Sequence, residues 1–283
     1  MGMTVNGSIA TVSCTPHSVA HGQARWNGYV ITVNPEAQRT KRTVKLLRVL
    51  GIHVKTFLAI PAYSDDEVAK VRSNLLTQRA IYDAIARGHG QIDEYVFLFE
   101  DDILRAPNVP ATDVQSLLSC GAYYSRKRQL PLFYAGACAP RFVNNEPIWD
   151  GHPATPTQLK VATRVFARCA HAYAVRRRDA PMLRALADAH PNRGVGVMGG
   201  VSAANRSWYM DLQIESLARA QGGFYLVAPG GVAPAEQTLW WTARGIFYQD
   251  RVAFPSGIKP IDSRIAPRQK RWNAEPNNSS SSW

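Results

Sequence analysis

The first hundred residues alternate between two patterns of apolar positions. Short runs rich in β-branched and aromatic residues, at 28–33, 52–60 and 95–99, predict strands. Between them, residues 36–50 and 65–86 repeat apolar side chains near the helical period of about 3.6 and predict helices. Because strands separated by helices pair in parallel, this order predicts an α/β fold with a mostly parallel sheet flanked by helices.

The rest of the chain continues the alternation with longer interruptions. We expect helices at 111–120, 179–189 and 211–220, and strands at 9–14, 130–137, 168–175 and 224–228. Pro, Asn and Gly concentrate at 139–160, which predicts a long loop, and residues 229–260 are expected to be irregular. His171 lies inside an apolar strand and is expected to be an interior histidine rather than a metal ligand. Together these elements predict one Rossmann-type sheet, mixed but mostly parallel.

Length and composition fit one globular domain. The chain has 283 residues, of which 46% are apolar and 10% aromatic, so it can bury one substantial core. We expect a single domain over residues 1–266. Residues 267–283, which include four consecutive serines, are expected to form a disordered tail.

The charge balance favours anionic partners. Lys and Arg number 33 against 21 Asp and Glu, a net charge of +12, which suits nucleotide phosphates, nucleic acid or an acidic membrane surface. The basic residues form short, separate clusters at 39–42, 126–128, 176–178 and 268–271, without an aromatic-plus-basic RNA-binding signature. We therefore expect no nucleic-acid partner.

The cysteines and the apolar stretches indicate the cellular compartment in which the protein is expected. Cys14, Cys120, Cys138 and Cys169 lie far apart without a Cys-x-x-Cys pair, so reduced thiols are expected rather than a zinc site or a disulfide framework. The N-terminal residues lack the basic and apolar regions of a secretory signal, and no stretch approaches the length of a membrane span. These features predict a cytoplasmic protein, with peripheral membrane association left open.

Three consecutive carboxylates, Glu100, Asp101 and Asp102, directly follow the apolar run Tyr95–Phe99. Burying an unpaired charge is costly, so this acidic triplet must lie where a strand leaves the core and something positive compensates it. A divalent cation that holds a nucleotide diphosphate is one such partner, because Mg²⁺ and Mn²⁺ favour carboxylate and phosphate oxygens. A solvated acidic turn is the alternative. Ligands of open α/β sheets bind beyond the carboxyl ends of the strands, where Asn34 also lies, and this favours the site.

Six short segments around the triplet occur in a distinctive order. They are Tyr29–Asn34, Arg39–Arg42, Leu76–Ile85, Phe97–Ile103, Cys169–Ala180 and Trp208–Asp211. In this order, and over residues 28–250, the chain resembles glycosyltransferase family 25, which includes bacterial lipooligosaccharide galactosyltransferases and collagen galactosyltransferases. Glu-Asp-Asp after an apolar strand is the most specific of the matches.

The resemblance implies a GT-A fold and a metal-dependent transfer of a hexose or pentose from a nucleotide diphosphate, a UDP-sugar, to a glycan hydroxyl. Mn²⁺ or Mg²⁺ would be the cofactor, and it would stabilise the negative charge that develops on the leaving diphosphate. Asp102 becomes the candidate for direct metal ligation. Glu100 or Asp101 would contact the ribose, the metal or a metal-bound water.

Three further residues become candidates for contacts to the uridine and the phosphates: Asn34, Arg39 and Arg42. For the two arginines, an ordinary solvated first turn of a helix is the alternative. If the transfer inverts the anomeric centre, a carboxylate must take the proton of the acceptor hydroxyl, and Asp211 is the candidate base. An ordinary helix N-cap is the alternative for Asp211.

Two other classes of function stay open. A nucleotidyltransferase or phosphotransferase could use the same carboxylates with two metal ions. A noncatalytic protein that binds nucleic acid or glycans would carry the triplet as a surface turn, and its binding to nucleic acid would depend on salt but not on a metal.

Overall fold

The computed structural model describes residues 9–13, 25–65, 67–106, 109–142, 158–188, 214, 224–229 and 243–249. The helix predicted at 211–220 enters this part of the chain only at Ile214, which is helical and buried. The predicted tail at 267–283 lies outside it.

The alternation of strands and helices predicted for the first hundred residues is confirmed. It consists of β2 (Trp26–Thr32), α2 (Gln38–Val49), β3 (Ile52–Leu58), α3 (Glu67–Arg87) and β4 (Tyr95–Glu100). Helix α2 ends as expected at a glycine, because Gly51 has a φ of 75°, which glycine adopts without strain. Strand β2 pairs in parallel with β3 and with β4, so the carboxyl ends of all three strands lie at one edge of the sheet.

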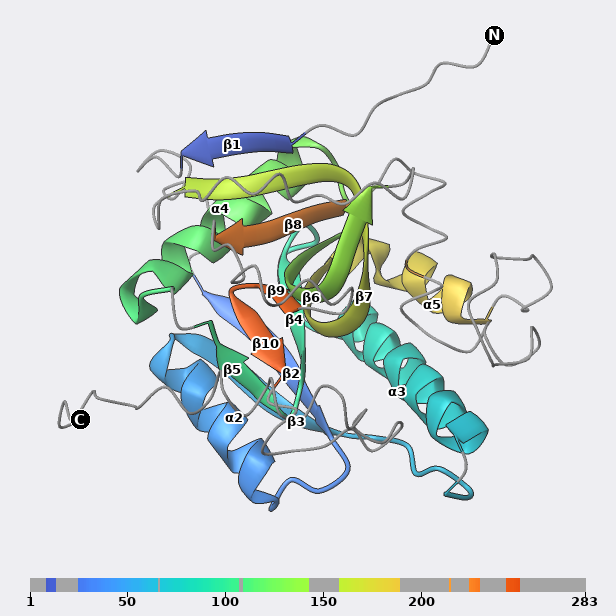
Figure 1. Cartoon of the computed structure of the whole chain (residues 1–283). Coiled ribbons are helices and arrows are strands. Elements are labelled where there is room, and N and C mark those ends of the chain that lie inside the picture. Colours follow the sequence, from blue (N-terminus) through green and yellow to red (C-terminus); the bar gives the residue numbers. More distant parts are fainter. Residues whose placement is uncertain are drawn as a thin grey trace, which may run out of the picture.

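Beyond β4 most strand pairs are antiparallel. The later elements are β5 (Ile103–Arg105), η1 (Ala111–Asp113), α4 (Val114–Lys127), β6 (Leu132–Phe142), β7 (Gln158–Arg176), η2 (Arg177–Asp179), α5 (Ala180–Asp188), β8 (Phe224–Pro229), β9 (Ala243–Gly245) and β10 (Phe247–Gln249), and β1 (Ile9–Ser13) precedes them all. The main sheet has eight strands in the order β3-β2-β4-β7-β8-β6-β9, with β1 beside β7, and β5 pairs with β10 in a second sheet. The fold is therefore mixed α/β (Figure 1), and the parallel pairs of its main sheet are β2 with β3, β2 with β4 and β6 with β8.

Two expectations about the later elements are wrong. Residues 139–142 and 158–160 belong to β6 and β7, not to a loop, and β7 extends over 19 residues. Residues 243–249, expected to be irregular, contain β9 and β10. Strands of three residues are too short to show a period of two, and the strand ends at 139–160 lie within a Pro- and Asn-rich stretch that hides them.

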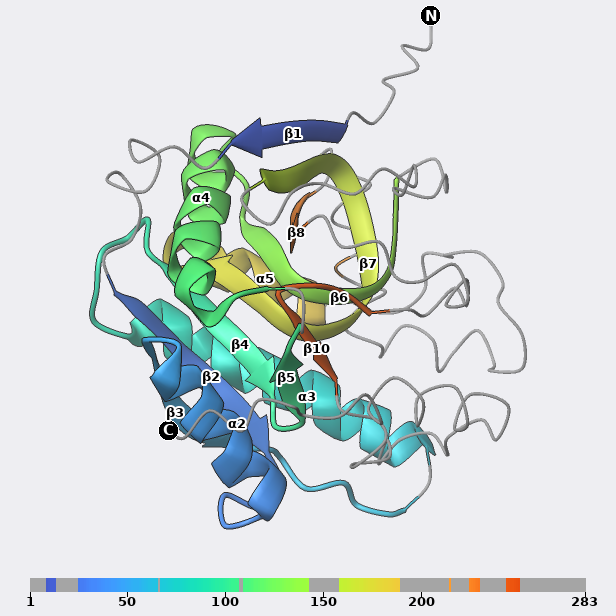
Figure 2. The same cartoon turned by 60° about the vertical axis from the view of Figure 1, so that its left-hand side comes forward.

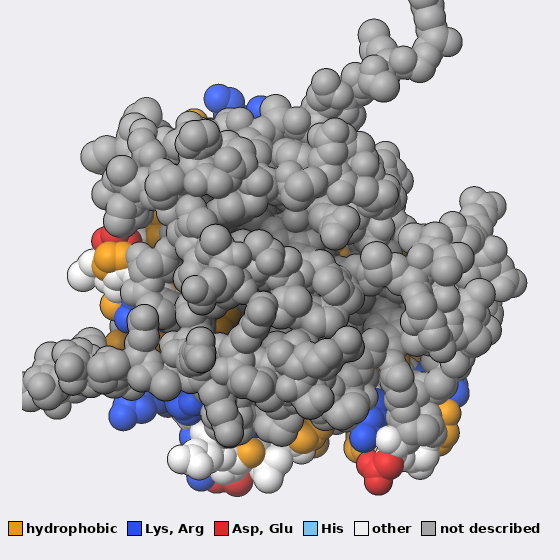
Figure 3. Space-filling model, in the orientation of Figure 1, with side chains coloured by type: hydrophobic (Ala, Val, Ile, Leu, Met, Phe, Trp, Pro, Cys, Tyr) orange, Lys and Arg blue, Asp and Glu red, His pale blue; other side chains and the backbone are white. Residues whose placement is uncertain are grey.

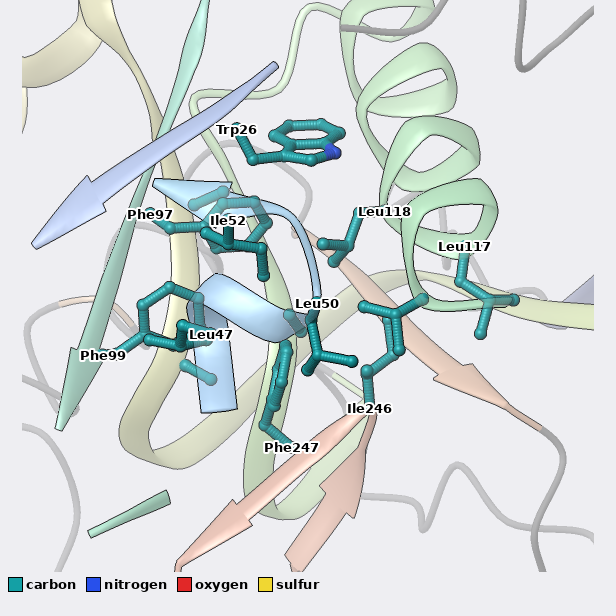
Figure 4. Packing of buried hydrophobic residues seen from close by; sticks show 14 of the residues in the cluster. Trp26, Leu47, Leu50, Ile52, Phe97, Phe99, Leu117, Leu118, Ile246 and Phe247 are labelled. Carbon is teal, nitrogen blue, oxygen red and sulfur yellow. The ribbon is translucent and has the colours of Figure 1, made fainter. Parts of the chain in front are cut away.

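Helices cover both faces of the sheet (Figures 1 and 2). On one face, α2 and α4 pack against aromatic side chains of β2 and β4: Leu47 and Leu118 lie among Trp26, Phe97 and Phe99, all of them fully buried (Figure 4). The Phe97 and Phe99 rings stack with centroids 5.2 Å apart. This core fixes α2 beside the end of β4, where the acidic triplet begins.

The other face of the sheet is covered by α3 and α5. Tyr82 of α3 and Leu183 of α5 pack with Leu98 and Tyr173 of the sheet in a second buried cluster. Of the helices that the structure describes, none is both long and apolar enough to cross a membrane, including the 21-residue α3.

Two predictions about single residues have different outcomes. His171 is fully buried, and its Nε2 lies 3.1 Å from the Phe247 carbonyl oxygen, so its expected interior role is confirmed. Cys120, fully buried in α4, is disulfide-bonded, so the expectation of reduced thiols is wrong for this residue. Spacing along the chain does not reveal which cysteines a fold brings together.

Candidate functional site

The acidic triplet lies at the sheet edge where β3, β2 and β4 end. Glu100 is the last residue of β4, and Asp101 and Asp102 form the turn that leads into β5. The backbone N–H of Ala59 donates to the Thr32 carbonyl oxygen over 2.8 Å, which places the exit of β3 beside that of β2. The chain segments that follow three parallel strands therefore meet at one place, as the sequence predicts.

Asp101 links this edge to the first turns of α2. Its Oδ2 accepts hydrogen bonds from Arg39 Nε at 3.0 Å and from the Thr32 and Thr40 hydroxyls at 2.7 Å and 3.2 Å. The Thr43 hydroxyl donates to the Asp101 backbone carbonyl at 2.9 Å. With only 7% of its surface exposed, Asp101 uses its charge inside the protein to hold α2 and to orient the Arg39 guanidinium.

Asn34 shapes the connection between β2 and α2. Its side-chain Oδ1 accepts the Glu36 backbone N–H at 2.9 Å, and its carbonyl oxygen lies 3.0 Å from the Thr40 hydroxyl. Asn residues stabilise turns in this way because their side chain mimics a backbone carbonyl. Asn34 is exposed at this edge, so the turn leaves it accessible beside the triplet.

Helix α2 gives this side of the molecule a positive charge. Its sequence carries five basic residues, Arg39, Lys41, Arg42, Lys45 and Arg48, and no acidic residue. In the space-filling view, Lys and Arg side chains gather on the side of the molecule where α2 lies (Figure 3). Arg42 is half-buried, one helical turn beyond Arg39. Both arginines are thus on the helix that Asp101 anchors, in a field that attracts anions.

Glu100 and Asp102 have surroundings unlike those of Asp101. Asp102 is buried, with 3% of its surface exposed, whereas Glu100 is half-buried. Glu100 follows Val96 and Leu98 along the face of β4 that is covered by α3. Its Oε2 accepts a hydrogen bond from the side-chain amide of Gln249, in β10. The three carboxylates therefore differ in burial, and Asp101 and Glu100 have different hydrogen-bond partners.

A buried polar group lies behind Glu100, on the side of α3. The Tyr82 and Tyr173 hydroxyls are 2.8 Å apart, and Tyr173 donates to Gln78 Oε1 at 2.7 Å. Burial is the main cause that raises the pKa of Tyr173 well above its usual value, and the Glu100 carboxylate adds to it. Tyr173 therefore stays protonated at neutral pH and can act as a hydrogen-bond donor.

The donor set at this edge fits a hard divalent cation. Glu100 and Asp102 offer carboxylate oxygens, which suit Mg²⁺ and Mn²⁺ rather than softer metals. In the described part of the chain, no group of three or more His, Cys, Asp or Glu side chains is placed to hold a metal ion. A nucleotide-binding Mg²⁺ site commonly has only one or two carboxylates, because substrate phosphates supply other ligands. Glu100 and Asp102 match that number and type of ligand.

Apolar side chains are exposed at the same edge. Val33 directly after β2, Leu58 at the end of β3 and Tyr63 shortly beyond it are each 60–68% exposed. Most large apolar side chains in the described residues are buried. Val33 and Leu58 lie at the ends of the adjacent strands β2 and β3 and expose apolar surface at the edge that carries the acidic triplet.

Several residues of this site carry no signal in the sequence. Thr32, Thr40 and Gln249 are common polar residues, and Gln249 lies 149 positions from Glu100. The tertiary pairing of β10 with β5 brings Gln249 to the triplet. The candidate base Asp211, and the aromatic residues around it, lie outside the described residues.

In comparisons with known proteins, the chain matches no family model and no curated protein sequence.

Proposed function

We propose that the protein is a metal-dependent glycosyltransferase of the GT-A type, which moves a sugar from a UDP-sugar or a similar nucleotide diphosphate to a hydroxyl of a glycan. One observation carries this proposal. At the carboxyl edge of three parallel strands, Glu100 and Asp102 lie next to an Asp101 that holds Arg39 and the basic helix α2 in place. Carboxylates beside fixed positive charge suit a bound metal and a diphosphate together.

Each group at the edge then has a role in binding the donor. Asp102 and Glu100 would hold Mn²⁺ or Mg²⁺, which would stabilise the negative charge that develops on the leaving diphosphate. Arg39 and Arg42 would contact the phosphates. Arg39 is already oriented through its Nε, so little side-chain entropy remains to be lost when an anion binds.

The nucleoside would occupy the apolar part of the edge. Val33, Leu58 and Tyr63 offer an exposed apolar surface for the base, and Asn34 offers a side-chain amide beside it. The acceptor hydroxyl would give its proton to a carboxylate on the far side of the sugar. Asp211 is the residue that we propose for this step.

The first test is a thermal-shift titration with nucleotides and nucleotide sugars, each with and without Mn²⁺. A ligand that binds only the folded state, present at about a hundred times its Kd, stabilises it by about 2.7 kcal/mol. We expect a shift with one UDP-sugar that requires Mn²⁺. We expect the variant Asp102→Asn to lose that shift and the transfer activity while unfolding cooperatively.

The matched control is Asp93→Asn, the same substitution near the opposite end of β4. Asp93 Oδ1 lies 3.1 Å from Arg178 Nη1 in a half-exposed ion pair, which contributes about 0–1 kcal/mol. This variant should keep the manganese-dependent shift. An equal shift for wild type and Asp102→Asn would remove Asp102 from the site. No shift with any nucleotide, together with binding of DNA that weakens with salt, would support the noncatalytic class instead.

A further inference from the structure

Gln249 is the side chain of β10 that reaches the acidic triplet. It is buried, with 8% of its surface exposed, and its amide Nε2 donates to Glu100 Oε2. An amide is neutral, so this bond orients the Glu100 carboxylate without cancelling its charge. The Tyr173 phenol, whose pKa the Glu100 carboxylate helps to raise, donates its own proton to Gln78 Oε1.

The strand that carries Gln249 is held at several points. Residues 247–249 pair with β5 in an antiparallel register that sets Gln249 opposite Ile103, the residue after Asp102. Ile246 donates its N–H to the Ala135 carbonyl at 2.7 Å and accepts the Ala106 N–H at 2.8 Å. These contacts fix the backbone of residues 246–249 within the fold.

Close packing behind β10 leaves it little freedom to move. A Cβ atom at Gly136 of β6 would lie 2.3 Å from the Phe247 carbonyl oxygen and 2.7 Å from His171 Nε2. Phe247 is fully buried, and its ring meets that of Phe99 with centroids 5.4 Å apart. Only glycine permits this approach of β10 to the main sheet, so the sequence places a glycine where the strand bearing Gln249 must come close.

We propose that Gln249 is a positioning residue, which holds the Glu100 carboxylate in the orientation needed to bind a divalent cation together with a nucleotide diphosphate. This inference rests on the proposed function of the triplet. Partners that orient metal-binding side chains matter because a rigid carboxylate loses less freedom when the metal binds, and removing such a partner typically costs about 10- to 100-fold in affinity.

The test measures Mn²⁺ binding in the presence of UDP, by the loss of the free Mn²⁺ signal in electron paramagnetic resonance. Gln249→Leu keeps most of the side-chain volume and removes the donor. We expect its affinity to fall by about 10- to 100-fold, while Gln91→Leu, at an exposed position near the other end of β4, keeps the wild-type affinity. Thermal unfolding of each variant without ligand shows whether the fold is kept.

A double-mutant cycle separates positioning from a general effect on structure. If Gln249 acts through Glu100, then Gln249→Leu should have no further effect on affinity in the Glu100→Gln background, because the two changes are coupled. Independent, multiplying losses would overturn the positioning role, and so would an unchanged affinity in Gln249→Leu. A wild-type protein that binds no Mn²⁺ with UDP would instead overturn the proposed function, and this inference with it.

Discussion

Asp101 is the member of the acidic triplet that the protein uses internally. Its Oδ2 accepts hydrogen bonds from one arginine and two threonines, and Asp101 is buried. Asp101→Asn keeps the shape but removes the charge that strengthens these bonds. We expect a loss of about 2–3 kcal/mol in the free energy of unfolding, because hydrogen bonds to charged groups each contribute about 1.5–3 kcal/mol. Urea unfolding should show a lower midpoint with an unchanged m value.

The neighbouring variant Asp102→Asn is the control for this prediction. It changes the same type of side chain one residue away but leaves the contacts to Thr32, Arg39 and Thr40 in place. Thr40→Val removes one of those contacts and should reproduce part of the loss. An Asp101→Asn protein as stable as wild type would show that α2 is held without this carboxylate.

At the level of residues, the sequence predicts that the acidic triplet lies at the end of a strand, but it does not predict the hydrogen-bond partner of each carboxylate. Three charges after a buried strand must lie at its exit, because burial without partners is too costly. Which carboxylate meets Arg39 and which meets Gln249 depends on the direction of each side chain at the strand end. That direction, and the arrival of Gln249 from β10, are set by tertiary pairing that local patterns do not contain.

The basic cluster at 176–178 joins secondary-structure elements and is not an open site for binding anions. Arg177 Nη2 lies 2.9 Å from Glu94 Oε2, each side chain is 11% exposed, and another guanidinium nitrogen donates to the Ile85 carbonyl near the end of α3. Breaking a buried ion pair by removing one partner costs about 3–5 kcal/mol. We therefore expect Arg177→Met to lower the free energy of unfolding by about that amount, measured by urea denaturation.

Arg178→Met is the matched control, at the next position along the chain. Its ion pair with Asp93 is half-exposed, so its loss should cost about 0–1 kcal/mol. The pair variant Arg177→Met with Glu94→Gln should cost less than the sum of the two single changes, since it leaves no buried charge alone. Equal, small losses for Arg177→Met and Arg178→Met would contradict the role of Arg177.

At the level of elements, long periodic segments are predictable and short or mixed ones are not. β2, α2, β3, α3 and β4 were expected close to their observed bounds, because each shows a clear period of two, a helical period or an apolar run. The strand β7 was expected to be much shorter, since its first half follows a Pro-rich stretch and carries scattered charges. The antiparallel pairing of β4 with β7 joins residues about 75 positions apart, beyond the reach of local pattern.

For the molecule as a whole, the net charge and the location of the edge agree with an anionic substrate. The excess of +12 is spread over the sequence in short clusters. The fold places the cluster at 39–42 at the triplet, whereas each arginine of the cluster at 176–178 forms an ion pair with an Asp or Glu of this chain. A basic composition favours anionic partners in general. The fold decides which of the basic clusters is available to meet them.

The disulfide of Cys120 gives a prediction about the whole protein. Disulfides persist in oxidising compartments and are rare in the cytosol, which counts against the cytoplasmic location expected from the sequence. We expect the denatured, unreduced protein to protect Cys120 from alkylation, with mass spectrometry of linked peptides naming its partner among Cys14, Cys138 and Cys169. Reduction, or Cys120→Ala, should lower the free energy of unfolding by about 2–5 kcal/mol.

The other cysteines provide the controls for this prediction, because exactly one of them can be the partner of Cys120. Replacing that partner by alanine should cost as much as Cys120→Ala, and the double variant should cost little more than either single one, since one bond is lost in all three. Replacing a cysteine that is not the partner should leave the response to reductant at Cys120 intact. Full alkylation of Cys120 in unreduced protein would show that this thiol is free, and the expected cytoplasmic location would then regain its support.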